Sequence, residues 1–154
     1  MDSLTLQQIK DLGKIREELC LTILIPTVRS GDTQQNPIRL KNALRDAENQ
    51  LAKRFPELDA EEVLAPIRAL IADRPYWEQQ DESLALLRTR SRLEQYRLPR
   101  RLEPHVHAGR RFHLKSLLPM FSGDGPFFLL ALSLGGCRLF RGNRYDIEEL
   151  AQEA

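Results

Sequence analysis

Eight arginines lie close together between residues 88 and 111, and only Glu94 and Glu103 oppose them there. A guanidinium binds phosphate through two parallel hydrogen bonds, so an arginine-rich segment is typical of a surface that follows a nucleic-acid backbone. Tyr96 could add stacking on a base. The alternative is a solvated or ion-paired face. The predicted nucleic-acid-binding residues are Arg88, Arg90, Arg92, Arg97, Arg100, Arg101, Arg110 and Arg111.

A second candidate site is the segment from Thr27 to Lys41, which joins an apolar run to the start of a helix. Amides at a helix N-terminus and the positive end of its dipole favour an anion. The segment therefore predicts a phosphate site. In the alternative interpretation Asn36 only caps the helix and the cations are solvated. The predicted anion-binding residues are Thr27, Arg29, Asn36, Arg39 and Lys41.

His105 and His107 would point to one side of an extended segment, and His113 follows nearby. Such a pair is compatible with zinc, but no suitably spaced carboxylate or cysteine completes a ligand set. The sequence therefore predicts no metal site and no cofactor.

Recognisable catalytic motifs are missing from the sequence. It has no Gly-x-Ser-x-Gly elbow and no glycine loop with a phosphate-binding lysine. The pairs Glu61-Glu62 and Glu148-Glu149 would diverge on a helix instead of facing each other. A non-enzymatic role is favoured.

The chain has 154 residues, 42% of them hydrophobic, which suits one compact domain and excludes a disordered tail. The net charge of +1 hides an acidic half and a basic half. Residues 1–83 hold 11 basic against 15 acidic side chains, and residues 84–154 hold 12 against 7. No apolar run is long enough to cross a membrane and no secretory signal is visible, so we expect a cytoplasmic protein. Cys20 and Cys137 are expected to be buried free thiols.

Several elements must position these residues. The apolar, β-branched run 19–25 predicts a central strand, closed by Pro26. Apolar periodicity predicts helices within 1–18, near 36–54 and over 59–73, with Tyr76-Trp77 as an anchor. Strands are expected at 83–89 and 93–98, followed by a loop at 99–104.

Towards the C-terminus a short helix is expected at 113–121 and a turn at 122–126. Gly135-Gly136 predicts a hairpin between 127–134 and 137–141, and a helix should begin near 147–151. Together these elements predict an α/β fold: a mixed β-sheet with packed helices, followed by a C-terminal β-hairpin that looks like the start of a second domain.

The order of short motifs resembles the bacterial family of archaeo-eukaryotic release-factor-like proteins. The motifs are Ile25-Pro26-Thr27, residues 36–41, residues 76–80, Tyr96-Arg97-Leu98-Pro99, residues 111–118 and residues 139–142. The resemblance implies a release-factor-like N-terminal domain at residues 1–121. It also implies that residues 122–154 are the turn and opening hairpin of an otherwise absent ribonuclease-H-like middle domain.

What the resemblance implies for function is an association with the ribosome or with RNA. The Gly-Gly-Gln tripeptide that promotes peptidyl-tRNA hydrolysis in release factors is missing, because Gly135-Gly136 is followed by Cys137. The stop-codon-reading motifs Asn-Ile-Lys-Ser and Tyr-x-Cys-x-x-x-Phe are missing too.

The leading expectation is thus a non-enzymatic RNA- or ribosome-associated module of a release-factor-like protein. One alternative is a stand-alone α/β domain that binds a phosphorylated small molecule at the 27–41 loop. Another is a purely structural assembly domain. The expected partners are RNA or the ribosome and no membrane, with self-association through the C-terminal hairpin.

Overall fold

The structure is a computed structural model that describes residues 3–121, 127–142 and 146–150. The chain divides into two compact units, Met1–Leu114 and Lys115–Ala154. The turn expected at 122–126 lies outside the described residues. The expected α/β class, with packed helices and a C-terminal hairpin, is confirmed.

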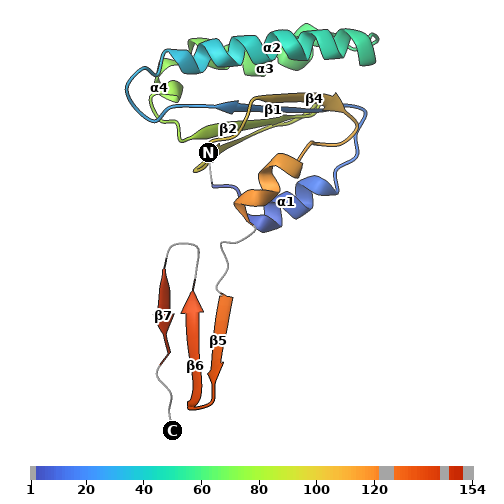
Figure 1. Ribbon diagram of the computed structural model, residues 1–154. Helices are drawn as coiled ribbons and strands as arrows, with labels where there is room; N and C mark the ends of the chain where they lie inside the picture. Colours follow the sequence, from blue (N-terminus) through green and yellow to red (C-terminus); the bar gives the residue numbers. More distant parts are fainter. Residues whose placement is uncertain (1–2, 122–126, 143–145, 151–154) are drawn as a thin grey trace. The chain divides into compact units, whose positions relative to one another are not determined.

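The first unit is built on a four-stranded sheet in the order β3-β2-β1-β4, with every neighbouring pair antiparallel (Figure 1). The strands are β1 (Cys20–Pro26), β2 (Ser83–Arg88), β3 (Leu93–Leu98) and β4 (His105–Gly109). All residues of β1 are buried, as its apolar run predicts for a central strand.

Helices α2 (Gln35–Arg54) and α3 (Ala60–Arg68) cover one face of this sheet (Figure 1). The inner stripe of α2 packs on alternate residues of β1, which places the main core between the helices and the sheet. That stripe consists of Leu40, Ala43, Leu44, Ala47 and Leu51.

The helix predicted over 59–73 is divided. Asp59 caps α3 by accepting hydrogen bonds from the amides of Glu61 and Glu62. A 3-10 turn, η1 (Ala69–Ala72), and the short helix α4 (Arg74–Trp77) follow. Trp77 is buried and its indole N–H donates to the Leu70 carbonyl at 2.7 Å, so its predicted role as an anchor is confirmed.

Helix α1 (Leu6–Gly13) lies on the opposite face of the sheet from α2 and α3 (Figure 1). Thr5 begins it through a capping box with Gln8. Ile9 and Leu12 are its buried residues. The sheet is therefore covered from both sides.

The second unit contains the 3-10 turn η2 (Lys115–Met120) and a three-stranded antiparallel sheet, ordered β5-β6-β7. The predicted hairpin is confirmed as β5 (Phe127–Ser133) and β6 (Gly136–Gly142), and Gly136 takes a φ of 144°, which favours glycine. The helix predicted near 147–151 is wrong, because β7 (Ile147–Glu149) pairs with β6 there.

Cys20 is buried as expected, but the expectation that Cys137 is buried is wrong. Cys137 lies exposed on β6. Among the described residues, no helix is both long and apolar enough to span a membrane.

Candidate nucleic-acid interface along strand β4

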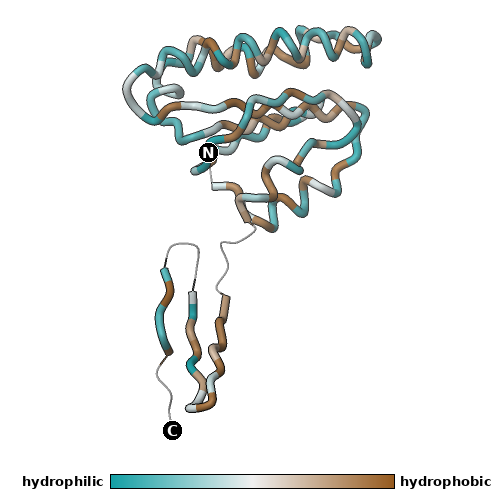
Figure 2. Tube along the Cα trace, viewed as in Figure 1, coloured by the Kyte–Doolittle hydropathy of each residue, from teal (hydrophilic) through white to brown (hydrophobic). Residues whose placement is uncertain are grey.

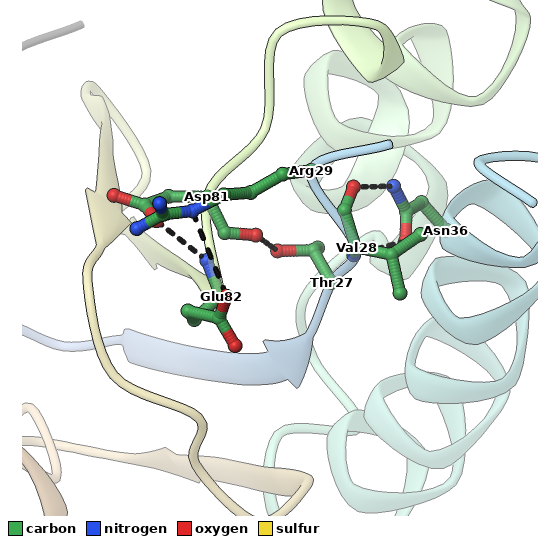
Figure 3. Close-up of polar contacts among 6 residues, drawn as sticks. All are labelled: Thr27, Val28, Arg29, Asn36, Asp81 and Glu82. Atoms are coloured by element: carbon green, nitrogen blue, oxygen red, sulfur yellow. Dashed lines mark hydrogen bonds and ion pairs between the residues drawn. The ribbon is translucent and has the colours of Figure 1, made fainter. Parts of the chain in front are cut away.

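Thr27, predicted to bind an anion, is used within the fold (Figure 3). Its hydroxyl donates to the Asp81 carbonyl at 2.6 Å, and its backbone N–H donates to the Glu82 carbonyl at 3.0 Å. Thr27 is buried at 1% exposure. Its two donors therefore tie the end of β1 to the segment that enters β2.

Asn36 is also a structural residue, and the expectation that it caps the helix is wrong. Helix α2 begins at Gln35, and the cap position is held by Gln34, without a side-chain hydrogen bond. The buried Asn36 amide bridges Val28 instead (Figure 3): Oδ1 accepts from the Val28 N–H at 3.0 Å and Nδ2 donates to the Val28 carbonyl at 3.2 Å. Both halves of the side-chain amide are engaged.

The start of α2 presents few amides to an anion. The amides of Gln35 and Asn36 donate to the Asp32 and Thr33 carbonyls, and Pro37 has no N–H. The first three helical residues therefore lack the open N–H groups that an anion site at a helix N-terminus needs.

The three predicted cations of this segment have different surroundings. Arg29 forms ion pairs with Asp81 and Glu82. Arg39 donates to the Pro26 carbonyl at 3.2 Å. Lys41 is exposed and lines a different hollow from Arg39. The three cations are therefore engaged at different places in the fold.

The arginine segment is divided by the strands that carry it. Arg88, predicted to contact nucleic acid, is only 8% exposed, and its Nε donates to the Val63 carbonyl of α3 at 2.9 Å. It stabilises the packing of β2 against α3 and does not lie at the surface. Arg97 is half-buried, and its β2 partner Leu84 belongs to the core below the helices.

Arg90 and Arg92 lie in the turn between β2 and β3 and have acidic partners. Arg90 is 3.2 Å from Glu18, and Arg92 is 3.7 Å from Glu94. Tyr96 is 8% exposed and donates its hydroxyl to Glu94 at 3.0 Å. The tyrosine is therefore not placed to stack on a base, contrary to the expectation.

Two exposed arginine pairs remain, one at each end of β4. Arg100 and Arg101 lie in the loop that enters the strand, and Arg110 and Arg111 follow its last residue. Within the described ranges, no acidic side chain pairs with Arg101, Arg110 or Arg111. At ~3.3 Å per residue, the five residues of β4 span about 13 Å. The fold thus places a cationic group at each end of one short edge strand.

The three histidines of the chain lie close to one another at β4. His105 and His107 share one side of β4, as their spacing predicts, and the register places them opposite Leu24 and Thr22 of β1. The His113 ring centroid is 4.1 Å from that of His105 and 6.0 Å from that of His107. The His113 amide donates to the Thr22 hydroxyl at 2.9 Å, which holds this segment over the sheet.

Gly109 provides the space that His107 occupies. A Cβ atom on Gly109 would lie 2.7 Å from His107 Nε2, so a larger residue would displace the ring. Burial is the main cause of a lowered His107 pKa, and the charges of Arg54 and His105 lower this pKa further. No three His, Cys, Asp or Glu side chains within residues 3–121, 127–142 and 146–150 form a metal-binding group.

Side chains of α2 cover the outer edge of β4. The Gln50 amide donates to the Val106 carbonyl at 2.7 Å and accepts from the Ala108 N–H at 2.9 Å. Arg54 donates to the Ala108 carbonyl at 2.9 Å. These hydrogen bonds satisfy outward-facing backbone groups of β4. Arg54 also adds a cation beside His107. Neither residue stood out in the sequence, since only the fold brings α2 beside β4.

A hollow of about 350 Å³ lies between α2 and the start of β4. Its polar side chains include Arg39, Asn42, Asp46 and His105. The Nε2 atom of His105 is buried without a hydrogen-bond partner in the described structure. This hollow adjoins the loop of Arg100 and Arg101 through Pro104.

Comparison with known proteins shows the fold alone. No family model matches the sequence, and no curated protein matches it. Among solved structures the chain is similar to one titled "Archaeal protein", with a TM-score of 0.53 and 12% sequence identity. The match covers 97% of this chain and 45% of that one, so this chain spans less than half the length of that protein.

Proposed function

We propose that the first unit is a non-enzymatic module that binds RNA along β4. The observation that carries the proposal is the placement of two exposed arginine pairs, Arg100/Arg101 and Arg110/Arg111, at the ends of one strand. Cations spaced along one surface neutralise successive phosphates of a nucleic-acid strand. Arg54 donates to the Ala108 carbonyl of β4 and adds a cation between the two pairs.

This surface is suited to contacts with the RNA phosphate backbone and less to contacts with the bases. Arginines supply phosphate contacts, whereas the buried Tyr96 leaves the surface without the stacking platform that was expected. Binding should therefore depend little on sequence. A structured RNA such as that of the ribosome offers many such phosphates.

The resemblance to the bacterial release-factor-like family supports the same role. Its motifs extend over much of the chain, and the proteins that it resembles work in translation. On that basis we propose ribosome association in the cytoplasm for this module. Without a Gly-Gly-Gln tripeptide, the chain would bind RNA and leave peptidyl-tRNA hydrolysis to other factors.

Salt-dependent RNA binding tests the proposal. Fluorescence anisotropy with a labelled single-stranded RNA should give an affinity that falls with salt, with a log–log slope of about −0.7 per phosphate contact. The variants Arg100→Ala/Arg101→Ala and Arg110→Ala/Arg111→Ala should each reduce the slope by about 1.4 and weaken all sequences alike. The control Arg90→Ala/Arg92→Ala removes two ion-paired arginines from the same segment and should have a smaller effect.

Two other outcomes would contradict the proposal. If Arg39→Ala abolished binding of ribose 5-phosphate while both arginine pairs were silent, the hollow beside Arg39 would be a small-molecule site. If no variant changed binding to RNA or ribosomes, the unit would be an assembly domain with a solvated arginine surface.

A further inference from the structure

Strand β5 exposes an apolar surface that nothing in the described structure covers. All seven of its residues, Phe127 to Ser133, are uncharged and exposed, and Figure 2 shows the strand in the colour of hydrophobic residues. Phe128 is 63% exposed and Leu132 76%. Apolar exposure of this extent marks an interaction surface.

Both faces of β5 are apolar. Phe127 and Leu129 point to one side of the sheet, and Phe128, Leu130 and Leu132 point to the other. A strand of this kind is typical of the interior of a sheet. Within the described residues, however, β5 pairs only with β6 and lies at an edge.

The other three edges of the two sheets carry protection against strand pairing. Gln50 and Arg54 form hydrogen bonds with outward-facing backbone carbonyls of β4. Strand β3 carries Glu94 and Arg97, and two of the three residues of β7 are glutamates. Charged residues and covering side chains prevent pairing between edges. Only β5 lacks both kinds of protection among the edges described.

We propose that β5 pairs antiparallel with β5 of a second copy of this chain, around a two-fold axis at Leu130. Because Leu130 is the midpoint of the strand, this register pairs all seven residues and places Phe128 opposite Leu132. An uncharged strand meets no like charge when it pairs with itself, whereas β7 would place glutamates near glutamates. The self-complementary edge thus selects a second copy and gives a continuous six-stranded sheet.

Sedimentation velocity on the full chain tests the pairing. The mass should move from monomer to dimer as concentration rises. Leu130→Lys places two lysines opposite each other on the axis and should raise the dissociation constant at least about tenfold. The side chain is 55% exposed, so the lysine is tolerated in the monomer. The matched control Ile147→Lys, 51% exposed on β7, should leave the dimer unchanged.

Cross-linking tests the register independently of folding effects. In a Cys137→Ser background, Leu130→Cys should form an intermolecular disulfide, because paired residues lie within the Cα separation of about 4.4–6.8 Å that a disulfide needs. Leu132→Cys should not, since residues 132 of the two copies lie about 13 Å apart in this register. The buried Cys20 is common to both variants.

Three results would overturn the proposal: a monomer at every concentration, a dimer that Leu130→Lys does not weaken, or equal cross-linking at positions 130 and 132. None of them bears on RNA binding by the first unit.

Discussion

Replacement of Asn36 tests whether its side chain is a bridge or a helix cap. Asn36→Ala removes two hydrogen bonds, of 3.0 and 3.2 Å, and leaves the half-buried Val28 peptide unpaired. A lost hydrogen bond costs about 0.5–1.5 kcal/mol, and an unpaired buried group costs about 1–3 kcal/mol. We expect Asn36→Ala to lower the free energy of unfolding by about 2–4 kcal/mol.

Asn36→Asp distinguishes the two roles more sharply. Aspartate caps a helix as well as asparagine does. If Asn36 were a cap, Asn36→Asp would therefore leave the free energy of unfolding unchanged. In the bridge, a carboxylate oxygen would replace Nδ2 and face the Val28 carbonyl without a proton. The aspartate variant should therefore be destabilised too.

The free energy of unfolding can be measured by urea titration with Trp77 fluorescence as the signal. This signal reports on the first structural unit, because the only tryptophan of the chain is buried there. The control Gln35→Ala removes an exposed neighbour and should change stability by less than about 0.5 kcal/mol. If Asn36→Asp were as stable as the parent chain, the bridge would be refuted.

Two more measurements follow from the first unit. Leu44 is 1% exposed in the α2 stripe, so Leu44→Ala should cost about 2–5 kcal/mol in the same titration, and a cost below about 1 kcal/mol would contradict the packing. The His107 pKa is lowered from 6.5 in the fold, so the unfolded chain binds the proton first, and stability should fall as the pH drops below about 6.5. His107→Asn should reduce this loss between pH 7 and pH 5, measured as the urea midpoint, and an unchanged pH dependence would show that His107 does not cause it.

The sequence predicted the elements whose signals are local. The run at 19–25 is a central strand because it is apolar except for Thr22 and ends at Pro26. The apolar stripe of α2 and the start of a helix at residue 59 were predicted from equally local signals. In these cases periodicity and capping chemistry act within a few residues, and tertiary packing agrees with them.

The missed features depend on distant partners. Asn36-Pro37 has the pattern of a cap, but the side chain of Asn36 bonds to a loop eight residues earlier. Residues 147–149 have a helical composition, yet pairing with β6 makes them a strand. In the sequence, Arg88 could not be distinguished from the exposed arginines that follow it. Its position in β2 directs its side chain towards α3.

The candidate interface was predicted only in part. The arginine segment was visible, but strand register decided which arginines are exposed. The meeting of His113 with His105 was not visible, because it depends on the segment after β4 turning back over the sheet. The cover of β4 by Gln50 depends in the same way on the position of α2.

The strand order of the first sheet has a consequence for synthesis. The central strand β1 ends at Pro26, and its first partner β2 begins 57 residues later, at Ser83. At about 5–20 residues per second, the ribosome takes roughly 3–11 s to deliver that partner. During this interval the most apolar strand of the unit has no strand to pair with, but α2 and α3 are made within it. A nascent chain that first packs these helices on β1 would shield one face of the strand until the sheet can form.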